Sequence, residues 1–420
     1  MFNRQQFLTK KNFIIAALTI FIQYYDYHLF GFLAANIASH FFSSNETTIQ
    51  ILYTYFIMSL AMMAKPIGAI IFGKIGDSVG RSNSFKLSLT GTAIASIVLF
   101  ITPSYEVIGI FSALILLVCR MVICTLVSSG TDGVRIYIFE HIAISRRSLG
   151  MGIATLFMQA GSLLASLSAW FFTLHTMPSY SWKLAFLIGG VLGLSMVFIM
   201  KISNFSDKDQ MHKLADFDYY QKLTLRQIIK NDYKAFLLCV LVAGSIGSTT
   251  QFIIIFFGTY NFGVLKIIDR SIMQQYISIA IGCYMLFSLI GGLLADKFGP
   301  YKVFNFATFG VLIMAFVLSF QINEMIFNKW TYLIAVCCIP IMVMPAAAIY
   351  KRSIPKVIRY RFFSLSHAIG SVCISAPTAF ISTYLYLKTN IAWLPILYFI
   401  MTIIMIFFSV YYLNKKEFEN

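Results

Sequence analysis

The feature that most constrains this chain is a series of twelve apolar runs separated by short charged segments. Each run is close to the ~20 residues that a helix needs to cross about 30 Å of hydrocarbon. Only 11% of the 420 residues are charged and 59% are hydrophobic, whereas a soluble domain carries about 25% charged residues. The sequence therefore predicts an all-α integral membrane protein with twelve transmembrane helices. The predicted spans are 13–39, 49–72, 87–103, 107–134, 149–173, 184–200, 235–260, 273–295, 302–320, 330–350, 363–387 and 391–413.

Basic residues are distributed unequally between the two sides of these spans. With the N-terminus inside, the cytoplasmic segments hold 25 of the 32 Lys and Arg, the external loops hold five, and Lys65 and Arg120 lie within spans. This bias follows the positive-inside rule. We therefore expect both termini in the cytoplasm, a lipid bilayer around the spans, and no binding of nucleic acid despite the net charge of +16. We also expect a retained first span rather than a signal peptide, because the first apolar stretch continues past Asp26 without a small-residue cleavage site.

One short pattern occurs at corresponding places in the two halves of the chain. The loop after the second span has the spacing Gly-x-x-x-Asp-x-x-Gly around Asp77, and the loop after the eighth span repeats it around Asp296, 219 residues later. Parallel repeats of six spans are typical of transporters that alternate access by moving one half against the other. The predicted parts are an N-terminal six-helix half over 1–200, a cytoplasmic linker over 201–234, and a C-terminal six-helix half over 235–420.

Polar side chains inside the spans are candidates for solute or proton binding, because a charge in the bilayer is costly unless it is paired or hydrated. Asp26 lies in the middle of the first span, where a buried carboxylate can take up a proton on one side and release it on the other. Its neighbours Tyr24, Tyr25 and Tyr27 carry hydroxyls that can orient the carboxylate or bind solute. The alternative is a hydrogen-bonded aspartate that only packs the span.

Helical spacing separates the neighbours of Asp26 by face. Gln23 precedes Asp26 by three residues and can share its face, although an amide does not titrate. His28 follows Asp26 by two residues and points about 200° away. We therefore expect His28 to pack against neighbouring side chains rather than to act with Asp26.

Further polar positions occur in the fourth and eleventh spans. Arg120 lies well inside the fourth span, where it can bind a solute carboxylate, pair with Asp26, or serve the structure alone. Asp132 and Arg135 are three residues apart and can pair on one helix face, which favours a structural role over a coupling role. His367 in the eleventh span faces either the cavity or neighbouring helices.

The repeated loops predict a conformational latch. Their glycines permit a tight turn, Asp77 can lie at a helix N-terminus, where the dipole favours an anion, and Arg81 can pair with an acid such as Glu140. We expect removal of these contacts to alter the transport rate more than the choice of solute. The latch residues are Gly73, Asp77, Gly80, Arg81, Glu140, Asp296 and Gly299.

At these two loops the sequence resembles the major facilitator superfamily, whose signature joins spans 2 and 3 and recurs between spans 8 and 9. Flanking residues resemble its metabolite–proton symporter branch, which includes bacterial proline/betaine and dicarboxylate transporters. The resemblance implies the twelve-helix fold, a small-molecule substrate, protons as coupling ions, the bacterial inner membrane and a functional monomer. The matching segments are Gln23-Tyr24-Tyr25-Asp26-Tyr27 with Gly31, Lys65-Pro66-Ile67-Gly68-Ala69, Glu140-His141 with Arg146-Arg147, Ile354-Pro355 with Arg359-Tyr360, and Ser375-Ala376-Pro377.

Several positions depart from the pattern of that branch. The glutamate of its span 1 motif is Gln23 here, and the glutamate of its Gly-Gly-Glu motif in span 4 falls on Gly130. Its Tyr-Asn pair in span 11 reads His367-Ala368. Pro300 stands where an arginine closes the second loop, which predicts a weaker second latch. The resemblance alone therefore does not transfer a substrate or a coupling ion.

These observations predict a secondary transporter, with proton-coupled import of a small polar or zwitterionic metabolite or osmolyte as the leading hypothesis. An exchanger or efflux antiporter on the same fold and a non-transporting membrane sensor stay open as alternatives. An enzyme is not expected, because the sequence has no nucleophile–base set and no phosphate loop. No cofactor and no metal are expected, since the seven Cys form no CxxC pair and no zinc-spaced set with His.

Overall fold

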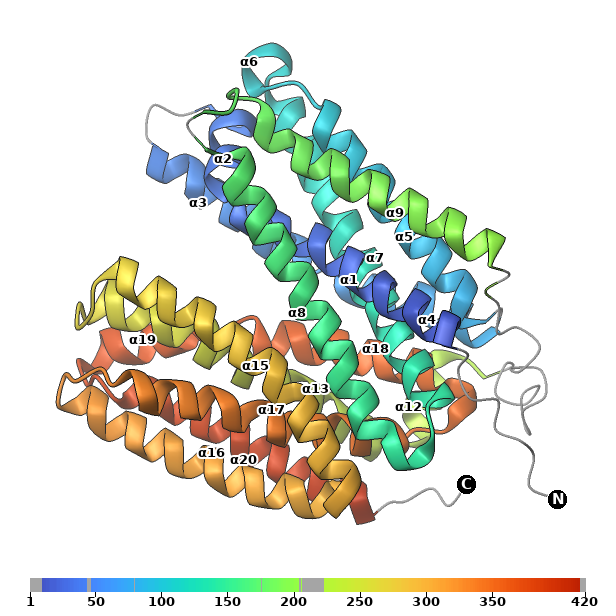
Figure 1. The fold of residues 1–420 in the computed structure, drawn as a ribbon, viewed down its shortest axis with the longest axis vertical. Coiled ribbons are helices and arrows are strands. Elements are labelled where there is room, and N and C mark those ends of the chain that lie inside the picture. The colour runs from blue at the N-terminus through green and yellow to red at the C-terminus, as the bar shows by residue number, and fades with distance from the viewer. Residues whose placement is uncertain are drawn as a thin grey trace. The chain divides into compact units, whose positions relative to one another are not determined.

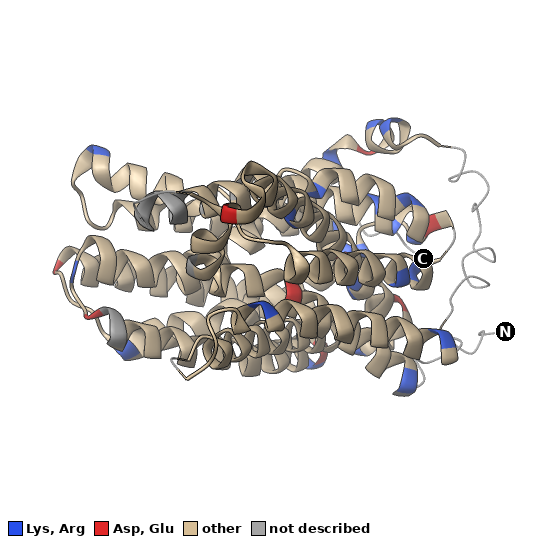
Figure 2. Ribbon diagram, turned by 90° about the horizontal axis from the view of Figure 1, so that it is seen from above, with Lys and Arg blue, Asp and Glu red and all other residues tan. Residues whose placement is uncertain are grey.

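The computed structural model describes residues 10–43, 47–78, 80–174, 176–203, 205 and 223–415, and within these ranges the chain is helical without a β-strand. Twelve helical stretches are long and apolar enough to cross a membrane, which confirms the all-α fold and the predicted number of spans. Figure 2 shows charged residues mainly near helix ends, with few along the middles. The stretches are Lys11–Phe32, Phe56–Ser78, Arg81–Ile101, Ile110–His141, Ile144–Phe172, Ser181–Ile202, Tyr233–Val264, Ile272–Phe298, Pro300–Asn323, Lys329–Arg352, Lys356–Thr389 and Leu394–Lys415.

The chain forms two compact units that do not follow the order of the sequence strictly. The first unit comprises Met1–Glu140, Phe157–Leu223 and Val357–Leu365, and the second comprises His141–Leu156, Thr224–Lys356 and Ser366–Asn420. Each unit thus includes one short segment from the opposite half of the sequence. Helices α8 (Arg147–Phe172) and α18 (Arg359–Gly370) are each divided between the units.

In the first unit, α5 and α9 lie side by side, and α1 packs against both (Figure 1). Aromatic and aliphatic side chains such as Tyr25, Phe30, Leu116 and Phe186 form its buried core. Small residues let such helices approach closely in a membrane. The helices of this unit, besides parts of α8 and α18, are α1 (Lys10–Phe32), α2 (Ala34–Phe41), α3 (Thr47–Met62), α4 (Lys65–Ser78), α5 (Arg81–Ile101), α6 (Tyr105–Ile108), α7 (Ile110–His141) and α9 (Leu184–Ile202).

The second predicted span is two helices rather than one. A turn at Met63 and Ala64 separates α3 from α4. Pro66 has no backbone N–H to donate, so it fits the first turn of a new helix and would disrupt the interior of a continuous one. Helix α4 consequently carries Lys65 at its beginning and Asp77 near its end.

In the second unit, α15 and α16 each pack against α17, and α20 packs against α13 and α16. Two π-helical segments, Phe252–Phe256 and Tyr260–Val264, extend α13, and a third, Ser371–Ser375, connects α18 with α19. The helices of this unit are α12 (Leu225–Asn231), α13 (Tyr233–Gln251), α14 (Phe257–Thr259), α15 (Arg270–Phe298), α16 (Pro300–Asn323), α17 (Lys329–Arg352), α19 (Thr378–Thr389) and α20 (Leu394–Lys415).

The predicted linker over 201–234 is described only in part. Residue 204 and residues 206–222 lie outside the described residues, and so do the aspartates at 207, 209, 216 and 218. The described remainder contains α12, which begins with a capping box between Thr224 and Gln227. Such a box satisfies backbone N–H groups at a helix start, so this end of the linker is ordered helix.

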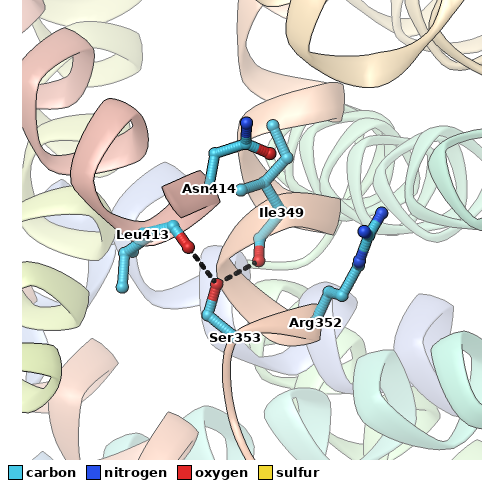
Figure 3. A pocket seen from close by; sticks show the side chains of 5 residues that line it. All are labelled: Ile349, Arg352, Ser353, Leu413 and Asn414. Carbon is cyan, nitrogen blue, oxygen red and sulfur yellow. Dashed lines mark hydrogen bonds between the residues drawn. The ribbon is translucent and has the colours of Figure 1, made fainter. Parts of the chain in front are cut away.

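A small hollow lies where the ends of α17 and α20 meet, and Figure 3 shows the five residues that line it: Ile349, Arg352, Ser353, Leu413 and Asn414. The Ser353 hydroxyl is within hydrogen-bond distance of the Ile349 carbonyl at 3.0 Å and the Leu413 carbonyl at 3.3 Å. This hydroxyl joins the two helix ends, and Arg352 is the one charged group in the lining. The hollow therefore belongs to helix packing, and the charged side chains that gather inside the spans lie elsewhere.

Candidate functional site

One face of α1 carries three neighbouring aromatic rings. Tyr24, Tyr27 and His28 have the spacing i, i+3 and i+4, which brings side chains together on a helix. The ring centroids are 6.2 Å apart for Tyr24 and Tyr27, 5.3 Å for Tyr24 and His28, and 5.2 Å for Tyr27 and His28. The expectation that His28 packs against its neighbours is confirmed.

Two basic side chains from other helices meet this aromatic face. Lys65 of α4 has its Nζ 5.4 Å from the centroid of the Tyr27 ring. Arg120 of α7 has its Cζ 4.9 Å from the same centroid and 4.6 Å from the centroid of Phe30. Aromatic faces attract cations at such distances, so the two rings hold both basic groups inside the unit.

Arg120 is fully buried and only partly satisfied. Its Nη1 donates to the carbonyl of Tyr27 at 3.0 Å. Its Nε and Nη2 are buried and have no acceptor within the described part of the chain. Buried donors are normally hydrogen-bonded, so this guanidinium is arranged for an acceptor that the described residues do not supply.

An ion pair between a buried acid and a partly exposed arginine lies beside Tyr24. Asp132 and Arg135 of α7 form the predicted i, i+3 pair, with an N–O distance of 3.6 Å. Arg135 Nη2 donates to the Tyr24 hydroxyl at 3.4 Å and lies 2.8 Å from the sulfur of Met158. Arg135 thereby connects the acid Asp132 to the aromatic face of α1.

Asp26 lies on a different side of α1 and faces α5. The Ser96 hydroxyl donates to Asp26 Oδ1 at 2.9 Å, and Gln23 Nε2 donates to the Ser88 hydroxyl at 2.6 Å. Both side chains thus contact hydroxyls of α5, which confirms the prediction that Gln23 and Asp26 lie on the same face of α1. Asp26 is almost completely buried, and no ion pair to it occurs among the residues described.

At Asp26 the structure differs from two of the alternatives that the sequence leaves open. Arg120 contacts Tyr27 and Phe30 rather than pairing with Asp26. The Tyr25 hydroxyl donates to the Ala185 carbonyl at 2.9 Å, so it does not orient the carboxylate. The group that does is Ser96, which the sequence reasoning missed. The sequence does contain an indication of this contact, because hydroxyl residues occur at every fourth position of α5. They are Ser84, Ser88, Thr92 and Ser96.

A second charged group, here named the Asp77 cluster, comprises Asp77, Arg81, Glu140, Arg359 and Arg361. Asp77 accepts from the backbone N–H of Tyr360 at 3.2 Å and from the backbone N–H of Arg361 at 2.9 Å, in the first turn of α18. It also pairs with Arg361 Nε at 3.2 Å and Arg81 at 3.4 Å. The position of Asp77 at a helix N-terminus is as predicted, and the dipole there favours an anion.

Glu140 completes the Asp77 cluster. Its Oε1 lies 3.2 Å from Arg81 Nη2, which confirms the predicted pair, and 3.0 Å from Arg359 Nη1. Two carboxylates thus pair with three arginines, and all five side chains are almost completely removed from solvent. Breaking such a buried network leaves charges uncompensated, which is strongly destabilising.

Tyr360 locks the first turn of α18 against α4, α5 and α7. A Cβ on Gly76 would lie 1.9 Å from the Tyr360 ring, and one on Gly133 would lie 2.4 Å from its hydroxyl oxygen. The hydroxyl donates to the Ser129 carbonyl at 2.7 Å and is within 2.9 Å of the Ser84 hydroxyl. The two glycines therefore provide the space in which this ring lies.

Tyr360→Phe is expected to lower the free energy of unfolding by about 1–2 kcal/mol, because the ring stays while the hydrogen bonds to Ser129 and Ser84 are lost. Denaturant unfolding of the purified protein in detergent measures this. Tyr384→Phe is the matched control, since its side chain is half exposed on α19. Equal stability of the two variants would contradict the assignment.

The second repeated aspartate has simpler contacts. Asp296 accepts from the backbone N–H groups of Ser148 at 3.0 Å and Leu149 at 2.8 Å, in the first turn of α8, within the second unit. No ion pair to Asp296 occurs in the described ranges of the chain. Gly299 precedes α16 with a φ of +97°, as Gly80 precedes α5 with a φ of +107°.

His367 lies half-buried in the part of α18 that belongs to the second unit.

The two repeated loops thus each place an aspartate on the first turn of a helix from the other half of the sequence. Residues 16–373 match the sequence profile of the Major Facilitator Superfamily. The chain belongs to the Major Facilitator Superfamily. It is therefore a multi-pass membrane transporter rather than an enzyme.

Relatives within the Major Facilitator Superfamily are distant in sequence. The proline/betaine transporter of Salmonella typhimurium is 23% identical over 416 residues, covering 94% of this chain and 81% of the relative. The citrate-proton symporter of Klebsiella pneumoniae is 24% identical over 387 residues, covering 87% and 83%. The solved E. coli fucose:proton symporter superposes with a TM-score of 0.74 at 12% identity, over 96% of this chain and 98% of that one. At this low identity, the likeness to the fucose:proton symporter supports only the assignment of the fold.

Proposed function

We propose that this chain is a proton-coupled importer of a small polar or zwitterionic metabolite that carries a carboxylate. It works by alternating access as a monomer in the bacterial inner membrane, with both termini in the cytoplasm. The observation that carries the proposal is the buried guanidinium of Arg120, with two nitrogen atoms lacking acceptors. Proline, betaine and citrate, named in the relatives, all carry carboxylates.

Carboxylate binding at Arg120 follows from the chemistry of its environment. A guanidinium binds a carboxylate through two parallel N–H···O bonds, which are stronger than neutral hydrogen bonds. The site is removed from water, so these bonds are not weakened by solvent. The rings of Tyr27 and Phe30 pack against the guanidinium, and the Tyr27 carbonyl holds its Nη1. A donor pair that is already held in place loses little freedom when solute binds.

Two buried carboxylates can carry the proton. Asp26 is bound by the Ser96 hydroxyl, and Asp132 is paired with Arg135. A carboxylate whose surroundings change between two conformations binds a proton in one and releases it in the other. Asp26 is the stronger candidate, because the described residues hold it by a hydroxyl and not by a cation.

The test is uptake into proteoliposomes under an imposed pH gradient, with radiolabelled proline, glycine betaine, succinate and citrate offered separately. An alkaline interior is expected to raise the initial uptake of the accepted solute by about tenfold, and an uncoupler should remove the increase. Asp26→Asn is expected to lose the response to the gradient while solute exchange continues. Asp269→Asn, an exposed position before α15, is the control and should respond like the unmodified protein.

The same assay distinguishes the alternative functions. Uptake that ignores the pH gradient and depends on solute inside the vesicle would replace the symporter by an exchanger. Saturable binding without flux for any offered solute would indicate a sensor. Uptake by Asp26→Asn that still follows the gradient would remove Asp26 from the proposal and leave Asp132 as the carboxylate to test.

A further inference from the structure

The second unit holds an amide side chain that is hydrogen-bonded at one end only. Gln251 is the last residue of α13 and lies near the middle of the membrane-spanning stretch Tyr233–Val264. The Ser375 hydroxyl donates to its Oε1 at 3.1 Å. Its Nε2 makes no hydrogen bond to any described residue. The side chain therefore has an acceptor that is held in place and two N–H donors that a solute can use.

The exposed part of Gln251 is expected to face water rather than lipid. The side chain is partly exposed, whereas Thr249 and Phe252 beside it are buried. Polar side chains inside membrane helices face the interior of the bundle or a water-filled cavity, because hydrocarbon offers them no hydrogen-bond partner. The Nε2 donors are thus accessible to a solute that enters from water.

Two π-helical segments meet at the hydrogen bond between Gln251 and Ser375. The segment Phe252–Phe256 begins directly after Gln251, and the segment Ser371–Ser375 ends at Ser375. Pro377 follows the second segment and has no N–H with which to continue the helical hydrogen bonds. Short π-helical segments are frequent at functional sites. Their meeting at one polar contact inside the spans indicates a functional position.

Close packing of backbones holds Ser375 beside Gln251. A Cβ on Gly247, one turn before Gln251, would lie 2.8 Å from Ser375 Oγ and 3.0 Å from its Cβ. A Cβ on Gly370 would lie 2.6 Å from the backbone nitrogen of Gly244. Small residues allow such close approach of membrane helices. The amide of Gln251 is thereby oriented before solute binds, so that it loses little freedom on binding.

The surroundings of Gln251 are polar but uncharged. The Thr250 hydroxyl is within 3.3 Å of the Tyr284 hydroxyl. No Asp, Glu, Lys or Arg occurs in residues 235–264 or 366–387. An amide donates to a carboxylate or hydroxyl oxygen without a change in its own protonation. Gln251 is therefore suited to recognise an oxygen atom of the solute and not to carry a proton.

We propose that Gln251 contacts the transported solute and donates a hydrogen bond from Nε2 to one of its oxygen atoms, and that Ser375 is a positioning residue for this amide. The proposal rests on the importer function proposed above and assigns to it a specificity-determining residue in the second unit. Loss of Gln251 should weaken solute binding, whereas the response to the pH gradient should persist, because an amide does not titrate.

Uptake into proteoliposomes over a range of concentrations tests this assignment, with radiolabelled proline, glycine betaine, succinate and citrate offered separately. Gln251→Leu removes the donors and approximately keeps the volume. It is expected to raise the KM of the accepted solute about tenfold, because a hydrogen bond to the solute is lost, and to change the maximal rate by less than about threefold. Calorimetry with the purified full-length protein should show a similar loss of affinity for the same solute.

Ser375→Ala frees the amide and is expected to raise the KM about threefold, while Ser375→Thr, which keeps the hydroxyl, should restore most of the affinity. Gln321→Leu on α16 is the matched control. Gln321 is also partly exposed, and its Oε1 accepts from the Thr331 hydroxyl at 2.7 Å, but it lies near the end of its helix. This variant should transport like the unmodified protein.

Size-exclusion profiles establish that the variants are folded, and Gln251→Asn, whose shorter side chain withdraws the donors, replaces Gln251→Leu if the latter is not. An unchanged KM and affinity in the folded variant would overturn the proposal, and so would an equal rise of the KM in Gln321→Leu. Uptake by the unmodified protein with an unchanged KM in Gln251→Leu would keep the importer, whereas neither uptake nor binding of any of the four solutes would refute both.

Discussion

Asp77→Asn is expected to reduce the maximal rate of solute uptake by more than about tenfold while changing the apparent KM by less than about threefold. Asp77 accepts hydrogen bonds from two backbone N–H groups of α18 and forms ion pairs with Arg81 and Arg361. Removing one partner of a buried ion pair costs about 3–5 kcal/mol. The conformation in which this cluster is assembled therefore loses most of its population, and alternating access requires each conformation in turn.

Initial uptake rates in proteoliposomes, measured over a range of solute concentrations, separate the rate from the KM. Asp296→Asn is the matched control, because Asp296 accepts two backbone N–H groups in the same way but has no ion pair in the described ranges. We expect its effect on the rate to be several times smaller. Equal effects of the two substitutions would mean that the arginines of the Asp77 cluster contribute nothing to transport.

Gly161→Ala is expected to destabilise the protein by about 3 kcal/mol or more and to leave little folded material. A Cβ at this position would lie 2.1 Å from the backbone carbonyl oxygen of Phe21 and 3.2 Å from the backbone nitrogen of Tyr25. Overpacking costs about 1–3 kcal/mol when side chains can rearrange. Here the obstacle is backbone, so α8 must separate from α1, which also carries Tyr24 and Tyr27.

Yield of monodisperse protein and its melting temperature in detergent measure the effect. Gly310→Ala on α16 is the control, since a Cβ there meets nothing within 4 Å, and it should behave like the unmodified protein. A Gly161→Ala variant with unchanged melting temperature and yield would show that α1 and α8 are not held as closely as the structure indicates.

The sequence predicts the parts of this molecule that depend on local spacing or on repetition. Twelve spans follow from run length, the pair of Asp132 and Arg135 follows from helical spacing, and the position of Asp77 at a helix N-terminus follows from the repeated loop. Helical spacing also separates Asp26 from His28. It gives the faces of α1 relative to one another but not the direction in which each face points, because packing with α5, α7 and α9 decides the rotation of the helix.

This missing rotation explains why the sequence leaves the contacts at the site open. Asp26 and Arg120 are intramembrane charges of opposite sign, and their pairing is one of three roles that the sequence allows for Arg120 when helix orientation is unknown. The structure turns Asp26 to Ser96 and Arg120 to Tyr27. The contact between Glu140 and Arg359 spans 219 residues, so local spacing gives no indication of it.

The exchange of short segments between the two units has a consequence for synthesis at the ribosome. Chains are made from the N-terminus, yet the first unit includes Val357–Leu365. The first six membrane-spanning stretches therefore enter the bilayer while Gly76 and Gly133 still lack the tyrosine ring that covers them, and Asp77 lacks its backbone donors. The Asp77 cluster can close only after about five-sixths of the chain has been translated, so it is among the last elements of the first unit to mature.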